Sequence, residues 1–125
     1  MIYLDTHVVV WLYARKGIGL SKAARQLIED DVMIAISPMV LLELDYLNET
    51  GRTTLGSGPV YDYLHKRIDL RLCEKPFAEL IRFASQQTWT RDPFDRIIVA
   101  QAAIDSNVLI TKDEVIREHY AHAVW

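Results

Sequence analysis

The chain opens with MIYLDTHVVVWL (residues 1–12), where a short, mainly apolar run ends in an acid and a second apolar run follows. The first run favours a strand at about 2–5 and the second a helix at about 7–14, which Gly17 and Gly19 then interrupt. In open parallel α/β sheets, ligands bind outside the carboxyl ends of the strands. The stretch therefore predicts an α/β fold with a functional edge at Asp5.

The rest of the chain repeats this alternation of strands and helices. Asn107 is the expected left-handed residue at the end of the helix that precedes strand 108–111. Unbroken apolar strands that alternate with helices predict a three-layer α/β/α sandwich with a central, mainly parallel sheet. We find no linker or repeat, so residues 1–125 are expected to form one domain. Further strands are expected at 32–36, 69–73, 108–111 and 122–125, and helices after Ser21, from Pro38 to about Thr50, at 60–67, after Pro76, after Pro93 and at 114–120.

One segment differs in composition from the rest. Residues 51–59, GRTTLGSGP, hold three of the five glycines and are expected to form the most flexible loop, a lid or a partner-binding edge.

The overall composition is that of a globular protein. With 125 residues and half of them hydrophobic, the chain can bury a core that needs no disulfide. The single cysteine, Cys73, is expected to be a core residue of a strand. No apolar run approaches the roughly 20 residues needed to cross a bilayer, and the start lacks a signal-peptide pattern. We therefore expect a cytoplasmic protein with no membrane partner.

Four acids stand beside predicted strand ends or in the first turns of predicted helices: Asp5, Glu43, Asp95 and Asp113. Right-handed crossovers bring such positions to one rim of the sheet. Four neighbouring carboxylates would repel one another, and an oxygen-ligated cation such as Mg²⁺ or Mn²⁺ relieves this repulsion. With four negative charges neutralised, the net charge of −3 becomes +1, so the acidity does not exclude a nucleic-acid substrate.

The reaction that suits such a rim is metal-assisted hydrolysis of a phosphodiester, in which a metal-activated water attacks and no protein nucleophile is required. The sequence has no recognisable serine or cysteine triad and no phosphate-binding glycine loop.

Three motifs resemble those of one protein family. Residues 91–102, RDPFDRIIVAQA, are similar to a signature of one branch of the PIN-domain ribonucleases of the VapC toxin type, and LDTHVVVWL (4–12) and LITKD (109–113) resemble the family's first and last acidic elements. The closing Val124-Trp125 also fits that branch. Two positions depart from it, because no Trp precedes Glu43 and Thr90 stands before Arg91.

The resemblance implies a PIN-like fold and a metal-dependent endoribonuclease that serves as the toxin of a type II toxin–antitoxin system. It implies a homodimer, a cognate antitoxin protein and an RNA substrate. Asp5, Glu43, Asp95 and Asp113 would bind Mg²⁺ or Mn²⁺ and carry catalysis, while Thr6, Arg96 and Thr111 are weaker expectations for substrate contacts.

Several acidic residues keep a second interpretation. Asp92 is either a further metal ligand or the N-cap of the helix that Pro93 begins, and we favour the cap. Asp5 and Asp113 could likewise be helix caps, and Asp45 is expected to be solvated. His7 is expected to be a polar residue at a helix start with no assigned role.

The alternative function is a non-catalytic, PIN-like or receiver-like module that binds Mg²⁺ for regulation or interaction. A receiver needs its phosphate-accepting Asp at the end of a middle strand, and no such residue is evident.

Overall fold

The computed structural model describes residues 1–30 and 33–125, and the predicted parallel sheet is present. The strands lie in the order β3-β2-β1-β4-β5, and each recorded pairing is parallel. The strands are β1 (Ile2–Leu4), β2 (Ile34–Ile36), β3 (Arg71–Leu72), β4 (Val108–Ile110) and β5 (Ala123–Val124).

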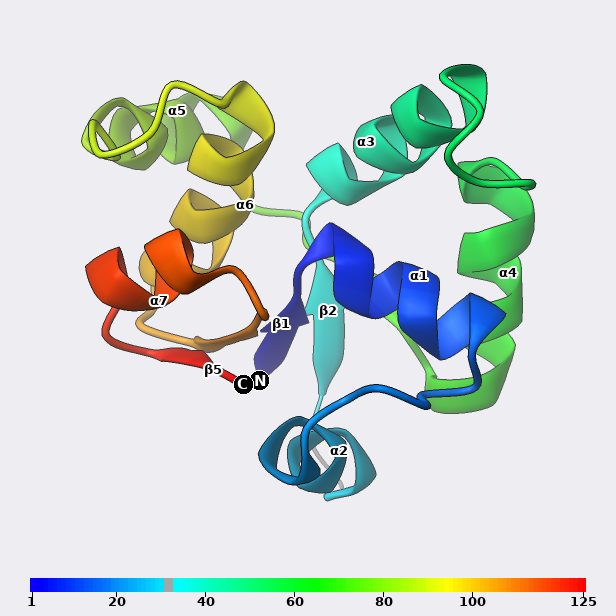
Figure 1. The fold of residues 1–125 in the computed structure, drawn as a ribbon. Helices are drawn as coiled ribbons and strands as arrows, with labels where there is room; N and C mark the ends of the chain where they lie inside the picture. The colour runs from blue at the N-terminus through cyan, green and yellow to red at the C-terminus, as the bar shows by residue number, and fades with distance from the viewer. Residues whose placement is uncertain (31–32) are drawn as a thin grey trace.

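Helices cover both faces of this sheet. In Figure 1, α1 and α4 lie on one side and α6 and α7 on the other, which confirms the three-layer arrangement. Among the described residues, none of the helices is both long and apolar enough to cross a membrane. The helices are α1 (Thr6–Ala14), α2 (Lys22–Glu29), α3 (Pro38–Glu49), α4 (Ser57–Ile68), α5 (Phe77–Ser85), α6 (Pro93–Ala103) and α7 (Glu114–His119).

The central strand β1 explains why the strand sequences are unbroken apolar runs. Tyr3 pairs with Ala35 of β2 and with Leu109 of β4, and all of Ile2–Leu4 is buried. A strand that has neighbours on both edges and helices on both faces has no solvent-facing side chains. The core of the protein therefore lies around β1.

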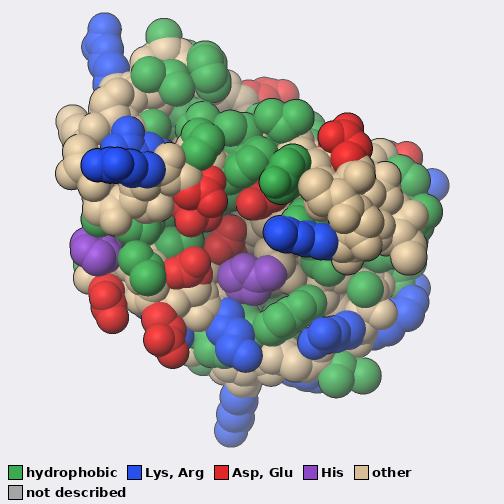
Figure 2. Space-filling model, turned by 45° about the horizontal axis from the view of Figure 1, so that its top comes forward, with side chains coloured by type: hydrophobic (Ala, Val, Ile, Leu, Met, Phe, Trp, Pro, Cys, Tyr) green, Lys and Arg blue, Asp and Glu red, His purple; other side chains and the backbone are tan. Residues whose placement is uncertain are grey.

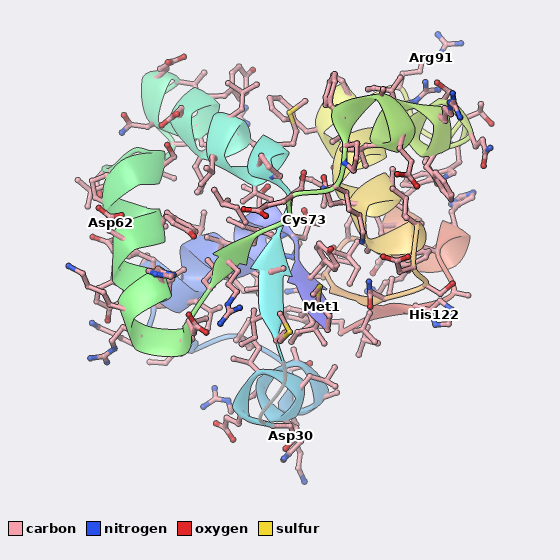
Figure 3. The ribbon with its side chains drawn as sticks, turned by 180° about the vertical axis from the view of Figure 1, so that it is seen from behind. Met1, Asp30, Asp62, Cys73, Arg91 and His122 are labelled. Atoms are coloured by element: carbon pink, nitrogen blue, oxygen red, sulfur yellow. The ribbon has the colours of Figure 1, made fainter. Side chains whose placement is uncertain are left out.

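The outer strand β3 is shorter than the predicted strand at 69–73. Asp69 adopts a left-handed conformation, with φ of 52°, and caps the C-terminal end of α4, so only Arg71 and Leu72 pair with β2. Cys73, labelled in Figure 3, follows this edge strand and packs against the core while only half-buried, so the prediction of a buried core cysteine within the strand is confirmed only in part. Its sulfur accepts a hydrogen bond of 3.1 Å from the Tyr3 hydroxyl.

The end of α6 also differs from the prediction, by one residue. Ser106, with φ of 55°, is the left-handed residue, and Asn107 is not. Asn107 N–H donates to the carbonyl of Ala102 and Ser106 N–H to that of Ala103, the two bonds of a Schellman motif whose left-handed position is Ser106. The expected start of β2 at Val32 lies outside the described residues.

Helix α4 begins at Ser57, three residues before the predicted start, because a side chain of α3 caps it. The Asp45 carboxylate accepts hydrogen bonds from the backbone N–H of Ser57 (2.8 Å) and from its hydroxyl (3.0 Å). Pro59 falls in the first turn, where a missing N–H costs nothing. Asp45 is therefore half-buried and structural, so the prediction that it is solvated was wrong.

Replacing this cap should destabilise the protein. We expect Asp45→Ala to lower the free energy of unfolding by about 1 kcal/mol, because two donors at the start of α4 lose their acceptor. Chemical denaturation monitored by circular dichroism measures this change. Asp62→Ala, an exposed residue of α4, is the matched control and should unfold like the wild type. Equal stabilities of the Asp45→Ala and control variants would contradict the capping role.

Candidate active site

The predicted acids share a cleft at the carboxyl ends of the strands. β1 lies between β2 and β4, so the strand order extends from β1 toward both edges of the sheet. Open α/β sheets bind ligands at such a switch point, where the strand order reverses. Figure 2 shows Asp and Glu side chains around a hollow in the middle of this face. The cleft has a volume of about 380 Å³ and is lined by Asp5, Thr6, His7, Val10, Trp11, Glu43, Leu47, Arg52, Thr53, Asp92, Asp95 and Asp113.

Asp5 is the most enclosed of these acids, with an exposed fraction of 4%. Its Oδ1 accepts from the N–H of Thr6 at 2.8 Å, which caps α1, and its Oδ2 accepts from the Thr111 hydroxyl at 2.7 Å. Capping, the alternative interpretation for Asp5, is therefore present together with a position in the cleft.

Thr111 connects Asp5 to Asp113. The Thr111 hydroxyl donates to Asp5 and accepts from the backbone N–H of Asp113 at 3.1 Å. Thr111 is completely buried and is not among the residues that line the cleft. We therefore interpret it as a residue that positions the two acids, in place of the substrate contact suggested by the sequence.

Asp113 and Asp92 each use only one carboxylate oxygen as a helix cap. Oδ1 of Asp113 accepts from the N–H groups of Val115 and Ile116, and Oδ1 of Asp92 accepts from those of Phe94 (2.8 Å) and Asp95 (3.5 Å). In the described part of the chain, their Oδ2 atoms have no hydrogen bond. A carboxylate has two oxygens, so a cap can also be a ligand, and the choice posed for Asp92 is not exclusive.

Glu43 enters the cleft from α3, where it accepts a hydrogen bond from the Thr6 hydroxyl. Burial raises the pKa of Glu43, and the nearby negative charges of Asp5 and Asp92 add to this effect. The Thr6 hydroxyl acts in the opposite direction, because it stabilises the charged form.

Asp95 has the most strongly shifted pKa of the acids in the cleft. Burial raises its pKa to about 7, and Asp92, Asp5, Asp113 and Glu43 all contribute, in that order. With a pKa of about 7, Asp95 is about half protonated at pH 7, as expected of a half-buried carboxylate among other acids when no cation offsets their charge.

His7 is a cleft residue to which the sequence assigned no role. Its Nε2 accepts from the backbone N–H of Lys112 at 2.8 Å, which places the ring proton on Nδ1, 3.6 Å from Oδ2 of Asp5. Burial lowers the pKa of His7, despite the opposing influence of Asp5 and Asp113. His7 is therefore a neutral side chain that joins the first residues of α1 to the loop that carries Asp113.

Two further observations concern the remaining predictions. Arg96 does not line the cleft, since its Nε donates to the carbonyl of Thr90 at 2.8 Å. Arg52 and Thr53 do line it, although no motif in their glycine-rich loop marks them as site residues. Across residues 1–30 and 33–125, no three His, Cys, Asp or Glu side chains are already grouped tightly enough to hold a metal ion.

A larger hollow, of about 910 Å³, lies elsewhere, beside β3 and the first residues of β1. Four of its charged side chains already form two ion pairs, Arg71 with Asp69 at 2.7 Å and Lys75 with Asp105 at 3.0 Å. It contains none of the predicted site residues, so the smaller acidic cleft is the candidate active site.

A parallel α/β fold with an acidic cleft at its switch point defines the class of protein, and comparison with known proteins identifies the family. Residues 2–121 match the family model of the PIN domain. The chain is 32% identical over 120 residues to Ribonuclease VapC22 of Mycobacterium tuberculosis (strain ATCC 25618 / H37Rv), a match that covers 94% of this chain and 91% of the relative. The chain therefore belongs to the PIN-domain family, and the predicted resemblance to VapC-type members is confirmed.

Solved structures agree on the fold. VapBC2 from Rickettsia felis, bound to a DNA fragment from its promoter, superposes with a TM-score of 0.65 at 19% identity, over 99% of this chain and 96% of that one. A toxin–antitoxin complex from Klebsiella pneumoniae gives a TM-score of 0.67 at 15% identity, over 100% and 97% of the two chains.

The raised pKa of Asp95 predicts a stability that falls as pH rises. The folded protein holds a proton up to about pH 7 that the unfolded chain releases near the ordinary aspartate pKa of 3.8, so this contribution is present below about pH 4 and lost as the pH rises through 7. We expect Asp95→Asn to reduce this slope and to raise the melting temperature by a few degrees at pH 8. Thermal unfolding between pH 4 and 8, in the presence of a chelator, measures both effects.

Asp62→Asn, on the exposed surface of α4, is the control and should keep the wild-type slope. A slope that is unchanged in Asp95→Asn would show that the pKa of Asp95 is not raised in the folded protein.

Proposed function

We propose that this protein is a Mg²⁺- or Mn²⁺-dependent endoribonuclease, the toxin component of a type II toxin–antitoxin system. The observation that carries the proposal is that five carboxylates line one cleft, where burial and then the charges of the neighbouring acids raise the pKa of Asp95 to about 7. The relative named as a ribonuclease, similar to this chain over nearly its whole length, supports RNA as the substrate.

The donor set fits a hard divalent cation. Carboxylate oxygens are the ligands that Mg²⁺ and Mn²⁺ prefer, and Oδ2 of Asp92 and of Asp113 have no hydrogen bond among the described residues. Asp5, Glu43, Asp95 and Asp113 would hold the ion, with Asp92 as an additional ligand. When bound, the ion would supply a Lewis acid that offsets the charge of the phosphodiester and acidifies water.

The protein's own residues hold these acids in place before a substrate arrives. The Thr6 hydroxyl fixes Glu43, the Thr111 hydroxyl fixes Asp5, and His7 holds the Lys112 backbone next to Asp113. Such positioning lowers the cost of arranging charged groups at the moment of reaction.

Protein partners form part of the proposal. Leu42 and Tyr46 on α3 and Phe77 and Ile81 on α5 are exposed, and a hollow of about 280 Å³ lies between the starts of these two helices. Apolar surface of this kind is typical of protein interfaces and supports the expected homodimer. The solved toxin–antitoxin complexes with this fold support an antitoxin as a second partner. We further propose one domain over residues 1–125 and a cytoplasmic location, where RNA is accessible.

Asp5→Asn tests the catalytic proposal. The amide keeps an oxygen acceptor for a neighbouring donor, so the variant should fold, while the loss of one ligand charge should lower metal-dependent cleavage of single-stranded RNA by about 100-fold or more. The measurement is the appearance of RNA fragments with Mg²⁺ or Mn²⁺ and their absence with a chelator. Asp62→Asn is the control and should cleave like the wild type.

Cleavage that is undiminished in Asp5→Asn would overturn the assignment. Calorimetric binding of Mg²⁺ to the wild type without any fragments would instead favour the alternative, a regulatory or interaction module.

A further inference from the structure

A second, mainly apolar cavity of about 270 Å³ adjoins the acidic cleft. We call it the side pocket. Val10, Arg52 and Thr53 line both cavities, so the two are neighbours that share one wall. The other residues of the side pocket are Tyr13, Ala14, Leu44, Gly51, Thr54, Leu55 and Val60.

Arg52 stands at the boundary between the two cavities. In the described part of the chain its guanidinium makes no hydrogen bond and no ion pair, although it lines the same cleft as five carboxylates. The guanidinium fork suits phosphate oxygens, which it binds in bidentate fashion. Arg52 is thus a cation available to an anionic group that enters the cleft.

Hydrogen bonds fix the backbone of the loop that carries Arg52. The N–H groups of Arg52 (2.8 Å) and Thr53 (3.3 Å) donate to the carbonyl of Leu47, and the Asn48 side-chain amide donates to the carbonyl of Thr53 at 3.0 Å. Gly51 has a φ of 80°, which other residues rarely adopt, so it permits this tight return from α3. The wall between the two cavities is therefore preformed.

The side pocket has the character of a site for a flat ring. Leu44 and Val60 are buried and form an apolar floor, and the Tyr13 ring is held edge-on against Tyr63 at 5.1 Å between centroids. Thr54 is a polar residue of this lining. An apolar pocket with an aromatic wall and a few polar groups is the usual environment of an unstacked nucleobase.

We propose that the side pocket is a nucleobase subsite. It takes the base of the nucleotide next to the scissile phosphate of single-stranded RNA, and Arg52 binds the phosphate of that nucleotide. This inference rests on the proposed function and extends it to substrate selection. Double-stranded RNA is a poor substrate because its stacked bases cannot enter the pocket.

The test is cleavage of a randomised single-stranded RNA, with the products sequenced to give the base preference at each position around the cut. Wild type should show a preference at one position beside the cut. Ala14→Trp fills the pocket from the exposed end of α1, and Tyr13→Ala removes its aromatic wall. Both should reduce that preference by about fivefold or more, while cleavage of the pooled RNA continues.

Arg52→Ala should raise KM by about tenfold with a smaller change in kcat, because it removes a charge-assisted contact to phosphate. Arg82→Ala is the matched control, since Arg82 is exposed on α5 and lines neither cavity. It should leave both KM and base preference unchanged. Melting curves of all variants confirm that they fold.

The outcomes separate this inference from the proposed function. Cleavage whose base preference is the same in wild type, Ala14→Trp and Tyr13→Ala overturns the subsite and leaves the nuclease standing. If no variant cleaves RNA, the test is the binding of fluorescent homopolymeric RNAs to Asp5→Asn, with and without Ala14→Trp. An affinity that depends on the base, and that loses this dependence with Ala14→Trp, supports the subsite. An affinity that Ala14→Trp leaves unchanged overturns it. An unchanged base preference, with loss of affinity for a protein partner in Ala14→Trp, would make the pocket a protein-docking site and also overturn the inference.

Discussion

Asp5, Asp92 and Asp113 each accept hydrogen bonds from backbone N–H groups at the start of a helix, and α1, α6 and α7 all begin at the same cleft. The other features of the site depend on this arrangement. Close carboxylates are unfavourable unless something offsets their charge, and N–H groups at helix starts supply partial positive charge at no cost to the fold. Each acid thus stabilises a helix and also contributes one wall of the cleft.

The helix starts balance only part of the negative charge in the cleft. Glu43 and Asp95 project from inside helices, and for both, burial and neighbouring charges raise the pKa. The fold therefore concentrates more negative charge in the cleft than the helix starts balance. Repulsion between carboxylates lowers the free energy of unfolding. Such a loss is typical of sites that bind a cation, because the bound cation raises the stability again.

Helix α3 also supports several parts of the site at once. Asp45 starts α4, while Leu47 and Asn48 of α3 hold the loop whose Arg52 borders the cleft. Helix α3 therefore has three roles. It carries Glu43 of the site, it caps α4 through Asp45, and it holds the loop that borders the acidic cleft. A substitution that shifts α3 would therefore affect Glu43, the start of α4 and the loop of Arg52.

The sequence alone determined the alternation of strands and helices, the placement of Asp5, Glu43, Asp95 and Asp113 at one edge, and the family, because these follow from local hydrophobic patterns and contiguous motifs. Only the tertiary structure decided which groups share a bond: Thr111 with Asp5, Asp45 with Ser57, and His7 with the backbone of Lys112. It also decided that a capping carboxylate lies in the cleft and that Arg52 stands beside it. These contacts join residues up to 106 positions apart, and no local pattern encodes which distant donor meets which acceptor.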